Sequence, residues 1–327
     1  MKAWLMDSMN GVDKLRLADI PDPTPGQGEV VLEIHYAALN PADRYLAEGQ
    51  YPARPSFPHI LGRDGLGTIW RLGSGVHSFA IGQTVGLLRG EVGVERHGTF
   101  AQFTAVPADY LISVPTGWTP QQTAGAPLTY LTAHMALNQW GKLPPSVVLI
   151  TGASGGVGVA SIHLALAMGH TVVGLSRSPE KAAKLKAIGA LAIFNPNDTQ
   201  WRRHLKAALG NRRVDLIIDQ IGGEQFNDVL GTLGHFGKVS AVGRLAGPVP
   251  NFNTAALLFG RFRIGGVAVS DYSTTQSHAA WNEILELLNK IGARPIIDRV
   301  FPFDQLPAAF ARLKDGPMGK VLLEIKK

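Results

Sequence analysis

One glycine-rich stretch decides the fold: Thr151-Gly152-Ala153-Ser154-Gly155-Gly156-Val157-Gly158. It follows an apolar run at residues 147–150, which indicates a buried strand, and precedes a helical pattern at 157–168 that stops at Gly169. Glycines in this setting permit a tight turn and let the backbone approach a pyrophosphate, while the N-terminus of the helix supplies N–H donors to the anion. The stretch therefore predicts a dinucleotide-binding fold; the alternative is a structural glycine turn without a ligand.

From about residue 127 onward, strands alternate with helical segments, which is typical of a parallel sheet with crossover helices. A helix is expected to begin at Pro179, because Ser178 before it and proline in its first turn make a favourable N-terminus, and to end at Gly189. The further strands expected in this sheet are residues 171–175, 214–219, 238–242 and 264–269. Together these elements predict an α/β fold with a doubly wound parallel sheet.

The first third of the chain predicts a different architecture, with short strands separated by turns. Residues 30–34 are one strand candidate, after a run rich in proline and glycine at 21–28. Near the C-terminus a helix is expected around 281–289 and a last strand at 321–325, so the tail is expected to complete the N-terminal domain. The predicted domains are an irregular β-rich one and a dinucleotide-binding one: residues 1–124 plus 267–327, and residues 125–266.

The composition excludes several classes of protein. Of 327 residues, 45% are hydrophobic and 17% charged, which is far from the composition of a disordered chain. The net charge is +6, yet 31 basic residues are dispersed among 25 acidic ones, so nucleic-acid binding is not expected. There is no cysteine, hence no disulfide and no thiolate metal site, and no apolar run is long enough to span a bilayer. A cytoplasmic protein without membrane attachment is expected.

The end of the second strand in a dinucleotide fold discriminates between cofactors. An acidic residue there hydrogen-bonds the ribose 2′-hydroxyl, whereas a basic one accommodates a 2′-phosphate. Here the place is taken by Ser176-Arg177-Ser178, with Lys181 one turn into the next helix and no acidic side chain at the strand end. NADPH is therefore the expected cofactor; the alternative is that Arg177 and Lys181 are ordinary surface cations.

Further motifs are spread along nearly the whole chain: Asn40-Pro41-Ala42-Asp43-Arg44-Tyr45, Gly49-Gln50-Tyr51-Pro52, Leu61-Gly62-Arg63-Asp64-Gly65-Leu66-Gly67, Leu128-Thr129-Tyr130-Leu131-Thr132-Ala133 and Gly319-Lys320-Val321-Leu322-Leu323. With the glycine turn, they resemble the zinc-independent quinone oxidoreductase (zeta-crystallin-like) branch of the medium-chain dehydrogenase/reductase superfamily. The resemblance implies a Rossmann domain joined to a β-rich GroES-like catalytic domain, with the nicotinamide in the cleft between the domains.

The resemblance also implies the site residues. The catalytic candidates are Tyr51, Tyr45 and Asn40, of which Tyr51 has a place similar to that of the proton-donating tyrosine in related enoyl-thioester reductases. The residues expected to bind the cofactor are Asn40, Thr129, Ser154, Gly155, Gly156, Val157, Gly158, Ser176, Arg177, Ser178, Lys181, Val242, Gly243, Val269 and Lys320. The alternatives are that Asn40 only begins a turn and that the tyrosines only pack.

Zinc-containing alcohol dehydrogenases of the same superfamily bind catalytic zinc through cysteine and histidine. By motif position those ligands fall here on Asn40, Arg63 and Leu128, none of which is an ordinary zinc ligand. The cysteine-rich lobe that binds structural zinc is replaced by residues 87–98, which contain no cysteine and one histidine, His97. No metal is therefore expected.

Without zinc as a Lewis acid, hydride delivery to an electron-poor acceptor needs less assistance than alcohol oxidation. The expected function is NADPH-dependent reduction of quinones or small α,β-unsaturated carbonyls (enones). The alternatives are an enoyl-thioester reductase and a protein that binds NADPH as a structural element or sensor without turnover. The resemblance further suggests a homodimer joined through the edge of the Rossmann sheet, near residues 262–269.

Overall fold

The computed structural model describes residues 1–88, 91–249, 251–252 and 254–326, which form two compact units. Unit 1 comprises Met1–Leu128, Tyr272–Ala279 and Arg294–Lys327, and unit 2 comprises Thr129–Asp271 and Ala280–Ala293. Helix α9 (Thr274–Ile291) is divided between them, so part of the predicted domain segment 267–327 belongs to unit 2. Five residues of the predicted domains lie outside the described residues: 89, 90, 250, 253 and 327.

Within the residues described, unit 2 is built on a six-stranded parallel sheet in the order β11-β10-β9-β12-β13-β14. Its strands are β9 (Val147–Ile150), β10 (Thr171–Leu175), β11 (Ala192–Phe194), β12 (Val214–Asp219), β13 (Leu233–Ala241) and β14 (Arg263–Gly266). The chain first builds outward from β9 on one side and then on the other, so the order reverses between β9 and β12, as in a Rossmann sheet. The predicted doubly wound fold is confirmed.

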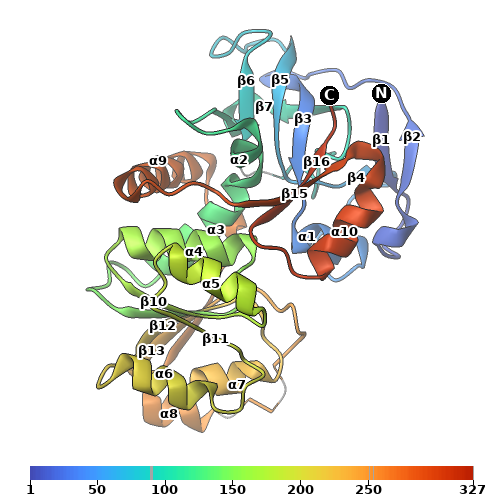
Figure 1. The fold of residues 1–327 in the computed structure, drawn as a ribbon. Coiled ribbons are helices and arrows are strands. Elements are labelled where there is room, and N and C mark those ends of the chain that lie inside the picture. The colour runs from blue at the N-terminus through green and yellow to red at the C-terminus, as the bar shows by residue number, and fades with distance from the viewer. Residues whose placement is uncertain (89–90, 250, 253, 327) are drawn as a thin grey trace. The chain divides into compact units, whose positions relative to one another are not determined.

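The helices of unit 2 are α3 (Pro127–Asn138), α4 (Gly156–Ala167), α5 (Pro179–Ala187), α6 (Trp201–Leu209), α7 (Gln225–Leu230) and α8 (Ala255–Gly260). Figure 1 shows α4 and α5 on one face of the sheet and α6 and α7 on the other. In α6, the side chains of Trp201, Leu205 and Leu209 recur every fourth residue and are buried. Such an apolar stripe is what holds a crossover helix against a sheet.

Several elements differ in length from the prediction. Strands β3 (Glu29–Ala38) and β13 are longer than the predicted 30–34 and 238–242, and β14 and α9 also differ. Strand β14 ends at Gly266 and not at residue 269, because its partner β13 ends at Ala241; the last contact is from Val267 N to Ala241 O at 2.9 Å. Helix α9 begins at Thr274, well before residue 281. Its start is fixed by a reciprocal cap in which Ser273 Oγ accepts from Gln276 N at 3.2 Å and Gln276 Oε1 accepts from Ser273 N at 2.8 Å.

Unit 1 is built on a mainly antiparallel sheet in the order β15-β16-β3-β5-β6-β8, with β7 also paired to β3, and on a small sheet in the order β2-β1-β4. The strands are β1 (Lys2–Met6), β2 (Arg16–Asp19), β3 (Glu29–Ala38), β4 (His59–Ile60), β5 (Asp64–Leu72), β6 (Thr84–Leu87), β7 (Phe103–Pro107), β8 (Leu111–Ser113), β15 (Ile297–Pro302) and β16 (Lys320–Glu324). Strand β16 pairs with β3, Leu322 opposite Ala38, so the tail completes the β-rich unit.

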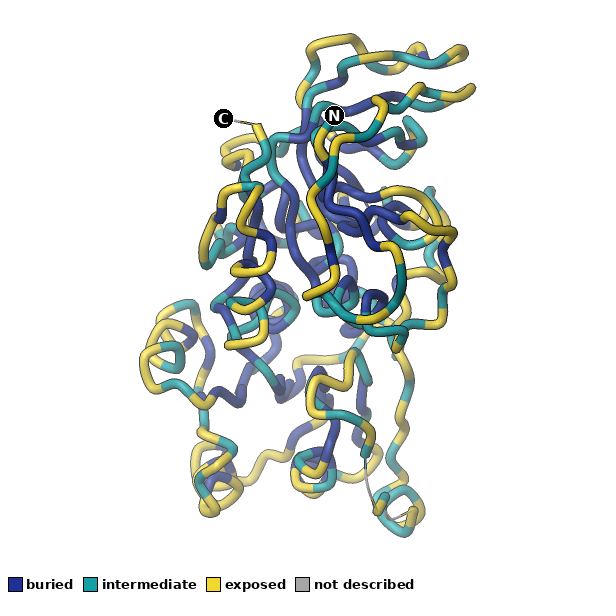
Figure 2. The backbone as a smooth tube through the Cα atoms, turned by 90° about the vertical axis from the view of Figure 1, so that its right-hand side faces the viewer, coloured by how far each residue is buried: buried dark blue, intermediate teal, exposed yellow. Residues whose placement is uncertain are grey.

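Short helices flank these sheets: α1 (Pro41–Ala47), α2 (Pro120–Gly125) and α10 (Leu306–Lys314). The apolar core of unit 1 includes Phe100 and Phe310, whose rings meet edge to face with centroids 6.0 Å apart. Strand β9 of unit 2 is buried at every position, and most of the exposed segments in Figure 2 lie at the outside of the traced backbone. In the described part of the chain, no helix is both long and apolar enough to cross a membrane.

Candidate active site

The glycine turn of unit 2 lies where neighbouring strands end. Ala153 N donates to the carbonyl oxygen of Leu175, the last residue of β10, at 3.1 Å. Thr151 N donates to the carbonyl oxygen of Ile218, near the end of β12, at 3.1 Å. The turn is therefore anchored on both sides of β9, at the point where the strand order reverses and where such sheets bind ligands.

Three glycines determine the shape of this turn. Gly152 has a φ of +56°, which favours glycine, and Gly155 is the N-cap of the 12-residue helix α4. A Cβ atom at Gly158 would lie 2.5 Å from Gly152 O, so only glycine lets α4 approach the turn so closely. The first N–H groups of α4 have no partner within the helix and lie at the positive end of its dipole. This arrangement fits a pyrophosphate.

A buried carboxylate, Asp219, holds the turn from the end of β12. Its Oδ1 accepts the Thr151 hydroxyl at 2.7 Å and its Oδ2 accepts the Gly222 N–H at 2.9 Å. Burial raises the pKa of Asp219, and the hydrogen bond from Thr151 opposes that rise. Gln220 Nε2 donates to Thr151 O at 2.8 Å. Asp219 and Gln220 were not among the predicted site residues. The sequence feature that could have indicated them is the run 219–223, in which polar and glycine residues occur at the end of a predicted strand.

The predicted contact residues Val242 and Gly243 lie beside Asp219. Their N–H groups both donate to Asp219 O, at 2.7 and 3.3 Å respectively. Because the carboxyl ends of parallel strands share one edge, the residues that follow β9, β10 and β13 lie at the same edge. The predicted residues 154–158, 176–178 and 242–243 are therefore on one side of unit 2. Val269 lies beyond the end of β14, in a 3-10 turn.

The residues predicted to recognise a 2′-phosphate follow β10 directly. Ser176 is buried, Arg177 is exposed, and Ser178 is the N-cap of α5, where its Oγ accepts from Lys181 N at 3.3 Å. The first acidic residue after β10, Glu180, is engaged in an ion pair along α5 at 2.6 Å. The end of β10 therefore offers hydroxyl and guanidinium groups, and no free carboxylate, to a ribose.

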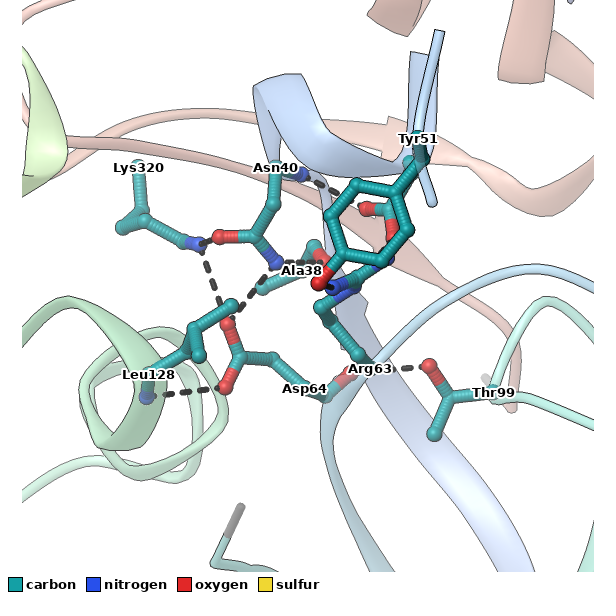
Figure 3. A network of polar contacts seen from close by, with 9 residues as sticks. Ala38, Asn40, Tyr51, Arg63, Asp64, Thr99, Leu128 and Lys320 are labelled. Carbon is teal, nitrogen blue, oxygen red and sulfur yellow. Dashed lines mark hydrogen bonds and ion pairs between the residues drawn. The ribbon is translucent and has the colours of Figure 1, made fainter. Parts of the chain in front are cut away.

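In unit 1, Asn40, Asp64 and Lys320 form a hydrogen-bonded cluster, which Figure 3 shows. Lys320 Nζ donates to Asn40 Oδ1 at 2.6 Å and to Asp64 Oδ2 at 3.1 Å. Asn40 Nδ2 donates to Asp64 Oδ2 at 2.9 Å. Asp64 is fully buried, and Asn40 and Lys320 are each only 4% exposed. Charges removed so far from water need such partners, because an unpaired buried ion is strongly destabilising.

This cluster joins distant parts of the chain. Asn40 is the N-cap of α1, Asp64 begins β5 and Lys320 begins β16. Asp64 Oδ1 also accepts the Leu128 N–H at 3.1 Å, and Thr99 Oγ1 donates to Asp64 O at 2.8 Å. Asp64 was not among the predicted site residues, although it lies in the motif 61–67. The sequence feature that could have identified Asp64 is an acidic residue directly before a stretch of glycine and apolar residues.

A second buried pair includes Arg63, the neighbour of Asp64 in sequence. Arg63 Nε donates to Asp43 Oδ1 at 3.1 Å, and these residues are 8% and 0% exposed. Asp43 Oδ2 accepts the Asn40 N–H at 2.8 Å and so helps to begin α1. Arg63 Nη1 donates to Tyr51 Oη at 3.4 Å. Of the predicted catalytic residues, Asn40 and Tyr51 are thus linked through Asp43 and Arg63.

The other predicted residues occupy different places. Tyr45 is half-buried on α1, with the Arg44 guanidinium carbon 5.2 Å from its ring centroid. Thr129 lies in the first turn of α3 and is 4% exposed. Tyr45 is in unit 1 with Tyr51, whereas Thr129 is in unit 2.

The side chains at the expected zinc-ligand positions do not form a donor set for that metal. The Asn40 amide is committed to Asp64 and Lys320, Arg63 is a cation paired to Asp43, and Leu128 is apolar. Zinc in proteins requires thiolate, imidazole or carboxylate ligands in a tetrahedral arrangement. Among the described residues, no group of three or more histidine, cysteine, aspartate or glutamate residues could hold a metal ion.

Two family models match the chain. The model described as zinc-binding dehydrogenase matches residues 156–299, and the model of the alcohol dehydrogenase GroES-like domain matches residues 26–116. The quinone oxidoreductase of Mus musculus is 28% identical over 330 residues, which cover 99% of this chain and 97% of the relative. The acryloyl-coenzyme A reductase of Sulfurisphaera tokodaii is 27% identical over 333 residues, which cover 94% of this chain and 96% of the relative.

Solved structures share the fold over the whole chain. A structure described as an NAD-dependent alcohol dehydrogenase has a TM-score of 0.91 and 27% identity, and the match covers 100% of both chains. A mycobacterial protein complexed with NADPH has a TM-score of 0.89 and 25% identity, and the match covers 99% of this chain and 100% of that one.

Replacing Gly155 by alanine tests whether the glycine turn binds a pyrophosphate. A Cβ at Gly155 would meet only Gly152 O, at an ordinary 3.5 Å, so the variant is expected to keep its thermal stability. The added methyl would stand where the backbone approaches the phosphates, so dinucleotide affinity is expected to fall about tenfold or more. Thermal unfolding and fluorescence titration with NADPH and NADH measure the two quantities.

Two further glycines serve as controls for that variant. Gly158→Ala places a Cβ 2.5 Å from Gly152 O and is expected to lower the unfolding temperature as well as the affinity. Gly231→Ala, at an exposed position in unit 2, adds a Cβ that meets only Asp228 O at 3.5 Å and Asn227 O at 3.7 Å, both ordinary contacts, and is expected to change neither. Unchanged dinucleotide affinity in Gly155→Ala would show that the turn does not contact phosphates.

Proposed function

The chain belongs to the medium-chain dehydrogenase/reductase superfamily, in its quinone oxidoreductase branch, and from this we propose that it is a zinc-independent reductase that transfers hydride from NADPH to quinones or enones. The observation on which the proposal mainly rests is the buried Asn40–Asp64–Lys320 cluster, which engages the Asn40 amide at one of the zinc-ligand positions. In the proposed mechanism no metal polarises the carbonyl of the substrate. Acceptors that are already electron-poor need that assistance least.

The cofactor proposal rests on unit 2. NADPH, when bound, supplies the hydride. Gly155 and Gly158 leave room for its pyrophosphate at the start of α4, and Asp219 holds the turn through Thr151. Arg177 is exposed at the end of β10, where its guanidinium is free to reach a 2′-phosphate and where no carboxylate competes. These features favour NADPH over NADH.

The proton donor proposed is Tyr51. Hydride addition to an enone leaves an enolate, and a phenol within reach protonates it efficiently. Tyr51 is half-buried, and its hydroxyl oxygen accepts from Arg63 Nη1 at 3.4 Å. The reduced form of a quinone needs a donor less, because its oxyanion is delocalised and takes a proton from water.

A second candidate function is enoyl-thioester reduction. It is favoured by the 27% identity to an acryloyl-coenzyme A reductase along 94% of this chain. Steady-state oxidation of NADPH and NADH against a panel of quinones, enones and enoyl thioesters separates the candidates. Turnover with none of them would instead favour a structural or sensory role for the bound cofactor.

The proposal also includes a cytoplasmic homodimer joined near residues 262–269. Among the described residues, β14 pairs only with β13, so one edge of the sheet is open. Apolar side chains are exposed in and near it: Leu258 is 71% exposed, Phe259 78% and Ile264 38%. Open strand edges and exposed apolar patches favour association, which sedimentation velocity would detect.

Removing the Arg177 guanidinium is expected to weaken NADPH binding and leave NADH binding unchanged. A charge-assisted phosphate contact contributes on the order of 1.5–3 kcal/mol, so Arg177→Ala should cost about 10- to 100-fold in NADPH affinity. Arg203→Ala, which removes an exposed cation from α6, is the matched control. Equal catalytic efficiency with both cofactors, unchanged in Arg177→Ala, would rule out this cofactor assignment.

Tyr51→Phe removes only the hydroxyl and keeps the ring. Enone turnover is expected to fall about 10²–10⁴-fold with NADPH binding preserved, because a positioned acid is lost, whereas quinone turnover should fall much less. Tyr110→Phe, which removes a hydroxyl bound to Glu91 Oε2 at 2.8 Å elsewhere in unit 1, is the matched control. Wild-type enone turnover in Tyr51→Phe, with chemistry shown to be rate-limiting, would exclude Tyr51 as the donor.

The purified protein is expected to contain no stoichiometric zinc and to keep its activity in a chelator. The physical reason is that Asn40, Arg63 and Leu128 lack the ligand chemistry that zinc requires. Elemental analysis by mass spectrometry measures the metal content directly. About one zinc per chain, with activity lost on its removal, would refute the zinc-independent mechanism.

A further inference from the structure

Arg63 is a buried cation with contacts beyond its ion pair. It immediately precedes β5 and is 8% exposed, and its partner Asp43 is fully buried. Desolvating two such charges costs as much as their attraction returns, so a buried ion pair is weak evidence for a contribution to stability. A role in the chemistry of the site is the better explanation for a guanidinium at this position.

The guanidinium lies against Tyr51 in two ways (Figure 3). Nη1 donates to Tyr51 Oη at 3.4 Å, and the guanidinium carbon is 4.9 Å from the centroid of the tyrosine ring. Nε is taken by Asp43 at 3.1 Å. The remaining nitrogen, Nη2, is buried and has no hydrogen-bond partner among the described residues. The guanidinium therefore retains an unused donor nitrogen, Nη2, next to the Nη1 nitrogen that contacts the phenol.

These contacts determine how the phenol can act. A guanidinium has only donors, so the Tyr51 oxygen must accept from Arg63 and its own proton must point elsewhere. The guanidinium of Arg63 stabilises negative charge on Tyr51 Oη. Once deprotonated, this oxygen can also accept a second hydrogen bond, from the unused Nη2 donor. This stabilisation grows as the proton leaves, so it lowers the barrier more than it stabilises the resting enzyme.

We propose that Arg63 is a positioning residue that orients Tyr51 as proton donor and stabilises the phenolate formed in the transfer, and that the acceptor is an α,β-unsaturated carbonyl. This rests on the proposed function. After hydride has reached the β-carbon, the enolate electron pair takes the Tyr51 proton to form the new C–H bond at the α-carbon. The electrons of the broken O–H bond stay on Oη beside Arg63, and water returns the proton. A quinone acceptor would leave this device unused.

The test needs a variant that folds, because Arg63→Gln alone would leave the Asp43 carboxylate buried and unpaired. The double substitution Asp43→Asn/Arg63→Gln, the neutral pair, removes both charges. Its new amide groups can hydrogen-bond each other, and Asn at position 43 can still accept from Asn40 N. The matched control is Asp298→Asn/Arg312→Gln, which neutralises an ion pair of 2.6 Å elsewhere in unit 1.

The neutral pair is made in two backgrounds, wild type and Tyr51→Phe, and single-turnover enone reduction is measured at saturating NADPH. If Arg63 acts through Tyr51, the neutral pair lowers the enone rate about 10- to 100-fold in the first background and less than about twofold in the second, with the affinity for NADPH unchanged in a separate titration. The control pair changes neither rate. An equal loss in both backgrounds, or no loss where Tyr51 is present, would overturn the proposal.

A readout that needs no turnover separates this proposal from the proposed function. Tetranitromethane nitrates phenolates, so Tyr51, relative to the other tyrosines, is expected to be nitrated several-fold faster in the wild type than in the neutral pair. Peptide mass spectrometry gives the ratio. Absence of reductase activity with slower nitration in the neutral pair would refute only the proposed function. Equal nitration in both proteins would refute the role of Arg63.

Discussion

The contact of 3.1 Å between Lys320 Nζ and Asp64 Oδ2 joins β16 to β5, two strands of the main sheet of unit 1 that are separated by β3. Both side chains are buried, so each charge is compensated by the opposite charge and by a hydrogen bond to Asn40 instead of by water. Removing either partner would leave an unpaired buried charge, at a cost of about 3–5 kcal/mol. Strand β16, the start of α1 and the first residue of β5 are therefore held in place by a single charged cluster.

The same cluster constrains the chemistry of unit 1. Asn40 is turned to Lys320 and Asp64, which leaves the neighbouring Arg63 to pair with Asp43 and to reach Tyr51. Asp43 and Arg63 therefore hold one side of the hydroxyl of Tyr51, the proposed proton donor. In unit 2 the side chain of Asp219 similarly holds the glycine turn through Thr151. The N–H groups in the first turn of α4 have no partner within the helix. In both units a buried carboxylate holds the residues to which the proposed function assigns a role.

Local sequence patterns predicted most of the strands, helices and turns, but few of the hydrogen bonds between buried polar side chains. Strand β9 coincides with the predicted residues 147–150 and the glycine turn with the start of α4, because both depend on neighbours in sequence. The bonds from Asp64 to Lys320 and from Thr151 to Asp219 could not be predicted, since each joins residues far apart in the chain. The end of β14 also depended on a distant partner, β13.

The most direct test of the account is to follow the hydride itself. The protein is incubated with an enone and NADPH that carries deuterium at the transferable C4 position, and the product is analysed by NMR. Deuterium is expected at the β-carbon of a saturated ketone, at a higher rate than with labelled NADH, in protein that contains no metal. Deuterium at the carbonyl carbon of an alcohol, or no transfer to any electron-poor acceptor, would contradict it.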